Sequence, residues 1–452
     1  MFKTAFERLQ QLYLRVFDTE FIRRIVRNSS YLVSATVVVA AIGFFQASFQ
    51  FRVLGVAGVG LFGVLATFTN VLNRLTAFRI DEMVVRYVRL YTQRGQHDKA
   101  AATYKMAALL ESLGAIAAFL LILWLAPLGV EIFSDQSGTE QWFILYGTLV
   151  LINLFYDSSD GLLQVFDRFD AKSVIDVSQS VLRFGLTVLV FYTGGGLREI
   201  ILAELAGRML RAGGIMTMAL YTARQRWGRG WWRAPFSVLQ EDRRSLLTFA
   251  FSTNASATIS LIAKDSEGLW VNGFLGNVAG GLYSTALGLI GLLQIPISPL
   301  PSTTYPELSR AVADNDWSSV RHVLKRGSQL ASVYSFPVML ILLVFGRQII
   351  TLWAGPDFVD AYAPLVILVL GYTFVNILYW NRAALLAFNR PVYPTIINFI
   401  GMLLKVGAIL LIGGSLGATG FAALLAGYYV FTVGLAALRV RRDVREHLAA
   451  PA

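Results

Sequence analysis

The feature that most constrains this 452-residue chain is a series of apolar runs, each about 20 residues long. A helix of about that length crosses roughly 30 Å of hydrocarbon at 1.5 Å per residue. Only 15% of the residues are charged, whereas roughly 25% is typical of soluble domains. The runs therefore predict an all-α integral membrane protein.

Counting the runs predicts about twelve transmembrane helices. Their expected ranges are 29–51, 57–78, 106–128, 142–163, 174–194, 199–222, 247–270, 279–302, 328–348, 363–386, 392–412 and 418–438. A correct count should gather lysine and arginine in the cytoplasmic segments. With both termini cytoplasmic, those segments hold 30 of the 39 lysines and arginines. The charge pattern thus favours twelve spans with both ends inside.

An internal repeat is indicated when the chain is aligned with itself at an offset of 221 in the numbering, which we call the repeat alignment. It places Leu54 and Gly55 on Leu275 and Gly276, at the expected external turn between the first two spans of each half. The run from Gly60 to Phe62 likewise falls on 281–283. Because each half would contain six spans, an even number, the repeat is expected to be parallel, with a substrate path between two six-helix lobes.

The expected organisation has five parts in chain order. They are a basic amphipathic helix along the cytoplasmic membrane surface over 1–28, an N-terminal lobe over 29–223, a basic cytoplasmic linker over 224–245, a C-terminal lobe over 246–438 and a basic cytoplasmic tail over 439–452.

Several kinds of chemistry are excluded or disfavoured. The chain has no cysteine, so disulfides and thiolate metal sites are excluded. His97, His322 and His447 are scattered over charged connecting segments, which favours solvated side chains over a metal site. The net charge of +11 follows from cytoplasmic lysine and arginine. No enzyme activity, metal, cofactor or nucleic-acid partner is therefore expected.

Two polar motifs have more than one interpretation. Gly58, Gly60 and Gly63 spell GxGxxG, but the motif opens an apolar span with no strand before it, so close helix packing is favoured over a dinucleotide site. Asp157 and Asp160 lie three residues apart on one helix face. They indicate either a polar helix end or a site that couples transport to a proton or cation.

Basic residues within the spans are the most informative, because an unpaired cation at bilayer depth costs roughly 2.5–3.5 kcal/mol on insertion scales. These residues are Arg183, Arg208, Arg211, Lys264, Arg382 and Lys405, with Arg52 at the outer end of the first span. Glu204 is spaced to pair with Arg208, and Glu267 is within reach of Lys264. The cations outnumber these acids, which predicts a cationic cavity suited to phosphate.

The glycine-centred turns are similar to those of a known family. The resemblance is carried by Arg52, Leu54, Gly55, Gly60, Leu61, Phe62 and Gly63, by Leu275, Gly276, Gly281, Leu282 and Tyr283, and by Pro306, Glu307, Leu308 and Ser309. In these residues, and in span number and orientation, the chain resembles polysaccharide flippases of the Wzx type. These belong to the multidrug, oligosaccharidyl-lipid and polysaccharide (MOP) exporter superfamily.

The resemblance implies a flippase for a polyprenyl-diphosphate-linked oligosaccharide of the undecaprenyl diphosphate type. Such a protein turns the repeat unit of a polysaccharide from the cytoplasmic to the external leaflet of the inner membrane by alternating access. By position, Arg52 and Lys264 are the expected head-group contacts, followed by Arg183, Arg208 and Arg211. The expected partners are this lipid, the membrane lipids and other polysaccharide-assembly proteins.

A rival function within the same superfamily stays open. A multidrug and toxin antiporter would export organic cations through an acidic cavity, for which Asp157, Asp160 and Asp176 are candidate coupling acids. A membrane enzyme of glycan assembly is disfavoured, because the external loops are short and no catalytic constellation accompanies the acids.

Overall fold

The structure is a computed structural model that describes residues 20–78, 80–134, 138–250 and 255–449. Side chains are described from residue 34 and, after the last gap, from residue 258. Every regular element within these residues is a helix. The amphipathic segment expected over 1–28 lies largely outside the described residues, and where the backbone is described it runs without a break into the first expected span.

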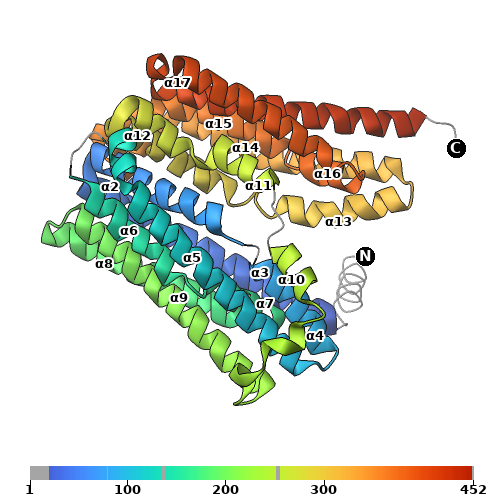
Figure 1. Ribbon diagram of the computed structural model, residues 1–452. Helices are drawn as coiled ribbons and strands as arrows, with labels where there is room; N and C mark the ends of the chain where they lie inside the picture. Colours follow the sequence, from blue (N-terminus) through green and yellow to red (C-terminus); the bar gives the residue numbers. More distant parts are fainter. Residues whose placement is uncertain (1–19, 79, 135–137, 251–254, 450–452) are drawn as a thin grey trace, which may run out of the picture.

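The first half of the chain, from α2 to α9, forms the lower group of helices in Figure 1. These elements are α2 (Glu20–Thr76), α3 (Ile80–Met83), the π-helical η1 (Val84–Val88), α4 (Arg89–Gln93), α5 (His97–Phe133), α6 (Glu140–Ile152), α7 (Tyr156–Val165), α8 (Phe169–Thr193) and α9 (Leu197–Trp227).

The second half, from α11 to α17, forms the upper group, coloured yellow to red from α12 onwards (Figure 1). After the short η2 (Trp231–Arg233), η3 (Phe236–Leu239) and α10 (Arg243–Ala250), the elements are α11 (Ala255–Ser260), the π-helical η4 (Leu261–Asp265), α12 (Glu267–Gln294), α13 (Leu300–Ala313), α14 (Trp317–Trp353), η5 (Pro356–Ala361), α15 (Tyr362–Ile377), α16 (Asn381–Ala387) and α17 (Val392–Ala449).

Three of the long helices are divided by a single glycine. Gly55 in α2 has φ 62° and ψ 178°, Gly276 in α12 has φ 79° and ψ 175°, and Gly417 in α17 has φ 62° and ψ 174°. Residues with a Cβ rarely adopt this backbone conformation, so glycine is needed at each break. Gly55 and Gly276 are a matched pair in the repeat alignment.

Seven helices among the described residues are long and apolar enough to cross a membrane. They cover Ser34–Thr76, His97–Phe133, Phe169–Thr193, Thr258–Gln294, Trp317–Trp353, Pro356–Ala387 and Val392–Ala449. Three of these contain a glycine break. The helix α9 is not among them and carries Glu204, Arg208 and Arg211 in its middle. Nor is the pair α6 and α7, which is interrupted between Ile152 and Tyr156.

The expected spans over 279–302 and 247–270 both differ from the helices that form. The span expected over 279–302 ends early, at Gln294, because Pro296 and Pro299 lie in the turn between α12 and α13 and proline removes a backbone donor. The span expected over 247–270 is not one regular helix, since the π-helical η4 interrupts it before α12.

The two halves contact each other through α2 and α12. A Cβ added to Gly60 would overlap the carbonyl oxygen of Asn277, and one added to Gly281 would overlap that of Val56. Only glycine therefore allows these backbones to approach so closely. This contact confirms that the GxGxxG motif serves helix packing.

The linker between the halves packs along the start of α5. The Lys99 ammonium lies 3.0 Å from the Asp242 carboxylate, and the hydrogen bond from Lys99 lowers the pKa of Asp242. Lys105 donates to the carbonyls of Trp232 at 2.9 Å and Ala234 at 2.5 Å. The linker thus covers basic groups at this end of the first half.

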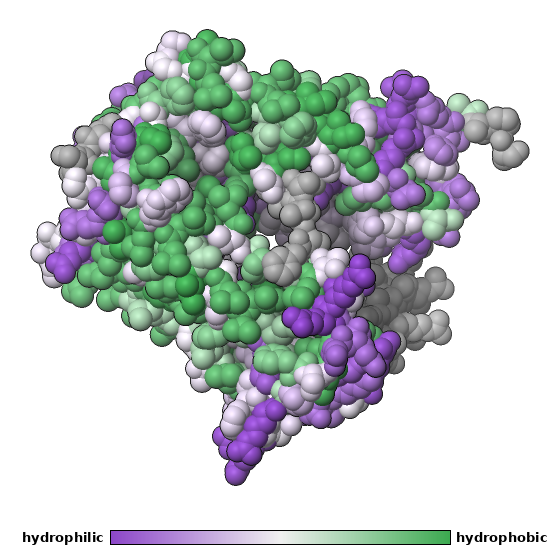
Figure 2. All heavy atoms as spheres, viewed as in Figure 1, coloured by the Kyte–Doolittle hydropathy of each residue, from purple (hydrophilic) through white to green (hydrophobic). Residues whose placement is uncertain are grey.

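The surface separates by polarity. Figure 2 shows a broad apolar area over the middle of the helices, with hydrophilic residues at the lower and right-hand ends and in a smaller group at the left. Large exposed apolar side chains such as Trp124, Tyr192 and Leu411 belong to long helices. A surface of this kind is suited to contact with lipid rather than water.

Candidate functional site

A pocket of about 280 Å³ lies between α2, α8 and α9 in the first half. Its lining residues are Ala35, Thr36, Val39, Ser173, Asp176, Gln179, Arg183, Arg208 and Arg211. The structure therefore brings together the three arginines expected from the sequence, along with one of the expected acids. We call it the first-half pocket.

Most charges of the first-half pocket are paired. The Arg183 guanidinium lies 3.0 Å from the Glu204 carboxylate and also donates to Gln46 Oε1 at 2.8 Å. Arg208 donates from Nε to the other Glu204 oxygen at 3.0 Å, which confirms the expected pairing of Glu204 with Arg208. Glu204, only 7% exposed, thus holds two arginines at once.

Arg211 is held by a different acid. Its Nε lies 2.6 Å from Asp176 Oδ1, and its guanidinium stacks over the Tyr156 ring at 4.7 Å. The arginines 183, 208 and 211 therefore face two carboxylates, those of Glu204 and Asp176. The formal balance around this pocket is one positive charge.

A second pocket of about 280 Å³ lies in the second half, and we call it the second-half pocket. It is lined by Ser260, Lys264, Arg382, Leu386, Pro391, Pro394, Thr395, Asn398 and Tyr428. No acid lines it, and among the described residues neither Lys264 nor Arg382 has a salt bridge. Lys264 lies 5.9 Å from the centre of the Tyr429 ring. This pocket carries two unpaired positive charges.

The expected pairing of Lys264 with Glu267 is wrong. Glu267 instead forms a salt bridge with Lys405, and both side chains are only 2% exposed. Tyr283 also donates to Glu267, at 3.0 Å, and Lys405 donates to the Ala263 carbonyl at 2.6 Å. The helix breaks at Ser266, so Lys264 and Glu267 do not share the face of one continuous helix. The break leaves Lys264 free to line the pocket.

Arg52 lies apart from both pockets. It is exposed and donates to the carbonyl oxygen of Leu352 at 3.1 Å, near the end of α14. Next to that carbonyl, the Trp353 indole donates to the Phe44 carbonyl at 2.8 Å. Arg52 therefore joins the two halves near the glycine breaks and does not converge with Lys264.

The other expected acids differ in their surroundings. Asp160 is buried and lies 2.6 Å from the Lys172 ammonium, while Gln164 donates to it at 2.9 Å. Asp157 is exposed and lines a smaller pocket of about 90 Å³, shared with Glu111. The two aspartates, three residues apart in α7, thus have different surroundings.

Glu111 is a residue that sequence reasoning missed. Its carboxylate accepts the backbone N–H groups of Asp157 at 2.6 Å and Ser158 at 3.0 Å, and so caps the start of α7. An acid within the span expected over 106–128 was a visible signal. Arg382 was among the basic residues noted within the spans but was not expected as a head-group contact. No local pattern in the sequence identified Gln46 as the partner of Arg183.

The linings of the two pockets are related along the sequence. In the repeat alignment Val39 of the first-half pocket falls on Ser260 of the second-half pocket. Asp176 falls on the residue just before Asn398. The acid of the first-half pocket thus has no acidic counterpart in the second, where Ile397 takes the aligned position and the neighbouring Asn398 lines the pocket. Among the described residues, no cluster of histidine and carboxylate side chains could hold a metal ion.

Comparisons with known proteins agree with this fold. A family model described as polysaccharide biosynthesis protein matches residues 25–312. The inner membrane protein YghQ of Escherichia coli (strain K12) is 26% identical over 352 residues, covering 75% of this chain and 95% of YghQ.

Solved structures resemble the chain over nearly its whole length. The lipid II flippase MurJ in an inward closed conformation has a TM-score of 0.68 at 14% identity, covering 92% of this chain and 89% of MurJ. An inward-facing multidrug resistance MATE family transporter of the MOP superfamily has a TM-score of 0.66 at 12% identity, covering 94% of this chain and 96% of that protein. The chain is therefore a multi-pass membrane protein that belongs to the polysaccharide biosynthesis protein family and has the fold of the MOP superfamily transporters.

Proposed function

We propose that this protein moves a lipid-linked oligosaccharide with a diphosphate head group, of the undecaprenyl diphosphate type, from the cytoplasmic to the external leaflet of the inner membrane. The observation that carries the proposal is the pair of unpaired cations, Lys264 and Arg382, in a pocket that no acid lines. Leaving cations unpaired among membrane helices is costly, so a bound anion is the expected compensation. A diphosphate offers several acceptor oxygens to such a pair.

The first-half pocket is proposed to assist in binding. Its surplus charge attracts an anion more weakly, because Glu204 and Asp176 already hold all three arginines. Lys264 and Arg382 are thus the proposed main contacts for the diphosphate. Arg183, Arg208 and Arg211 are proposed to contact the sugars or the second phosphate.

Twelve crossings in two six-helix lobes are proposed as the transport architecture, with both termini cytoplasmic. The seven long helices give ten crossings if each glycine break divides one of them in two. The pair α6 and α7 and the charged helix α9 supply the other two. Alternating access would then rock one lobe against the other about the α2–α12 contact.

The cytoplasmic assignment rests on charge, since lysine and arginine concentrate at one end of the helices. The location in the inner membrane is proposed from the family and from the printed name of YghQ. Other polysaccharide-assembly proteins are proposed partners, because translocated repeat units need further enzymes.

The test is reconstitution of the purified protein into vesicles that contain a fluorescent polyprenyl-diphosphate oligosaccharide. Translocation is followed by the access of a sugar-binding lectin added outside. Lys264→Ala and Arg382→Ala are each expected to slow translocation by at least about tenfold, as for a lost charge-assisted hydrogen bond. Arg347→Ala is the matched control, since this exposed arginine of α14 lines neither pocket. Full activity in both pocket variants would contradict the proposal.

A second candidate function is an organic-cation antiporter of the same superfamily. The observation in its favour is the pocket with the two carboxylates of Asp157 and Glu111. That pocket holds only about 90 Å³, whereas the first-half and second-half pockets are larger and carry a positive balance. Uptake of a cationic dye that requires Asp157, with no translocation of the lipid, would favour the antiporter.

Coupling to an ion gradient is a further part of the proposal. Asp160 and Asp176 are held by Lys172 and Arg211, whereas Asp157 faces a pocket, so Asp157 is the proposed coupling acid among the three. Asp157→Asn is expected to make lipid translocation insensitive to an imposed proton gradient. An unchanged response to the gradient in this variant would remove the coupling role.

A further inference from the structure

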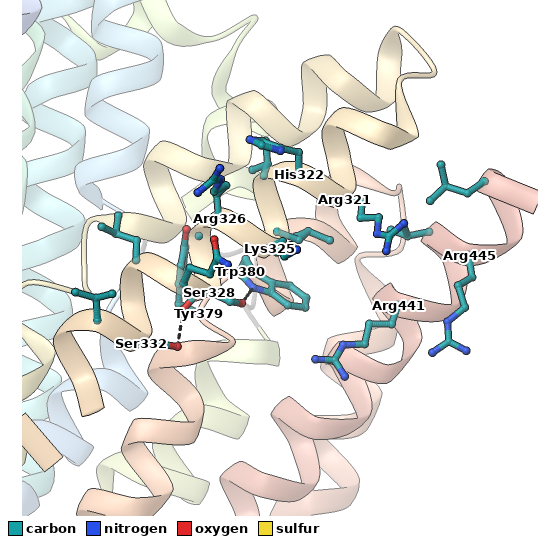
Figure 3. Close-up of a pocket in the computed structure, with 18 of the residues that line it drawn as sticks. Arg321, His322, Lys325, Arg326, Ser328, Ser332, Tyr379, Trp380, Arg441 and Arg445 are labelled. Carbon is teal, nitrogen blue, oxygen red and sulfur yellow. Dashed lines mark hydrogen bonds between the residues drawn. The ribbon is translucent and has the colours of Figure 1, made fainter. Parts of the chain in front are cut away.

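The cytoplasmic end of the second half contains a large basic groove between the start of α14 and the end of α17. Its basic residues are Arg321, Lys325, Arg326, Arg441 and Arg445, and its volume is about 1740 Å³ (Figure 3). No aspartate or glutamate lines it. Among the described residues, none of these five side chains forms a salt bridge. We call it the basic groove.

The floor of the basic groove is fixed by hydrogen bonds. The Trp380 indole donates to Ser328 Oγ at 2.7 Å (Figure 3). That hydroxyl in turn donates to the Ile377 carbonyl at 2.8 Å. Tyr379 is held by a hydrogen bond to Thr304 at 2.9 Å. The basic side chains therefore surround a rigid aromatic floor rather than a mobile surface.

The groove becomes apolar along α14. Leu330 and Val333 line it and are 62% and 75% exposed. At 1.5 Å per residue they lie roughly 8–12 Å beyond Lys325 along the helix axis. The lining thus changes from cationic to apolar over the distance between a phospholipid head group and its upper acyl chains. Leu448 of α17, 43% exposed, adds to the apolar part.

The matching region of the first half is already occupied. Lys105, which falls on Arg326 in the repeat alignment, donates to the carbonyls of Trp232 and Ala234 in the linker. The linker also provides Asp242 to Lys99. No described segment covers the second-half counterpart in this way, so its cations keep their charge available.

We propose that the basic groove binds the phosphate head group of an anionic phospholipid from the cytoplasmic leaflet, with the acyl chains along the exposed apolar turns of α14. Anionic lipids are enriched on that side, and basic pockets between helices attract their head groups. The groove is larger than a typical small-molecule site of roughly 300 to 1000 Å³, which fits a lipid better than a soluble ion. The proposal shares with the proposed function only the cytoplasmic assignment of this end.

The test is lipid binding to the purified full-length protein in neutral detergent, counted by native mass spectrometry. Phosphatidylglycerol and phosphatidylcholine with the same acyl chains are titrated separately. Phosphatidylglycerol is expected to bind at least about fivefold more tightly, and each lost groove cation is expected to cost about fivefold in affinity. Equal affinity of the two lipids would overturn the proposal.

Matched variants locate the site. Arg441→Gln combined with Arg445→Gln is expected to weaken phosphatidylglycerol binding by about 25-fold, and Lys325→Gln on the opposite wall by about fivefold. Arg442→Gln is the control, since Arg442 lies on the same helix turn, does not line the groove and pairs with Glu446 at 2.7 Å. If Arg442→Gln weakened phosphatidylglycerol binding as much as Lys325→Gln, the groove would be ruled out as the binding site.

Two further arms identify the ligand and keep the test independent of transport. Inorganic phosphate at the same concentration as the lipid is expected not to displace it, and displacement would show a soluble-phosphate site instead. Arg445→Lys keeps the charge and should retain binding, whereas loss in this variant would indicate a structural role for the arginine. Because binding is measured without translocation, failure here leaves the proposed function untouched.

Discussion

The first-half and second-half pockets have nearly the same volume and related positions, yet their basic side chains are paired with carboxylates only in the first. In the first, Glu204 and Asp176 hold three arginines. In the second, no acid lines the pocket, and neither Lys264 nor Arg382 forms a salt bridge among the described residues. One backbone plan thus supports a neutralised pocket in one half and a charged pocket in the other. This difference makes the second-half pocket the better candidate for anion binding.

The buried polar contacts between helices also differ in charge between the two halves. Gln46 of α2 accepts from Arg183 of α8, whereas Glu267, its counterpart in the repeat alignment, pairs with Lys405 of α17. The second half therefore buries a full ion pair where the first half uses a neutral amide. Because Glu267 pairs with Lys405, it is not available to pair with Lys264.

The largest expected effect tests the contact that the two halves share. Gly60→Val and Gly281→Val should each abolish recovery of folded protein, because the added side chain would overlap a backbone carbonyl. Gly43→Val in the same helix α2 is the control, since nothing lies within 4 Å of a Cβ at that position. Recovery of monodisperse protein by size-exclusion chromatography measures the effect. Normal yields of either contact variant would show that the halves do not require this approach.

The second-largest effect compares how much the two buried polar contacts contribute to the free energy of unfolding. Lys405→Met is expected to lower the free energy of unfolding by about 3–5 kcal/mol, because it leaves the buried Glu267 carboxylate without its partner. Arg183→Met should cost less, since Glu204 keeps Arg208. Denaturant unfolding in detergent measures both. Equal losses in the two variants would mean that the halves are stabilised alike.

A third prediction removes the acid that distinguishes the first-half pocket. Asp176→Asn frees Arg211 and copies the amide found at Asn398 in the second half. Binding of a soluble diphosphate sugar should strengthen by up to about fivefold, the scale of one partly exposed ion pair. Asn398→Asp is expected to weaken it. Isothermal titration measures both, and unchanged affinities would remove the charge contrast as the basis of selectivity.

The smallest effect concerns the start of α14. Asp316 accepts hydrogen bonds from Ser319 and Ser318, which lower its pKa to about 2, whereas Gln96 at the start of α5 makes no side-chain cap. A lowered carboxyl pKa stabilises the fold fully above the unfolded value near 3.9, and that contribution is lost as pH falls through about 2.

Asp316→Gln copies the first half at this position and should lower Tm slightly at pH 7. The difference from the unmodified protein should stay constant down to about pH 4 and shrink below it. Thermal unfolding over this pH range is the measurement. A difference that instead grows as pH falls would contradict the capping role.

Local patterns along the chain were enough to predict its class, its family resemblance and several contacts. Hydropathy over windows of about 20 residues reports on membrane helices without knowledge of their neighbours. The Glu204–Arg208 pair is four residues apart on one helix, so its geometry is visible in the sequence. The same holds for Gly60, whose role in helix packing follows from its place at the start of a span.

What local patterns could not supply was the choice of partner between distant segments. Glu267 pairs with Lys405, 138 residues away, rather than with Lys264, because a break at Ser266 turns it towards α17. Arg52 donates to the carbonyl of Leu352, 300 residues away, rather than lying beside Lys264 in the second-half pocket. Charge and hydropathy reveal which residues must find a partner in the membrane. Which partner each one finds depends on how the helices cross, and that is settled only when the whole chain has folded.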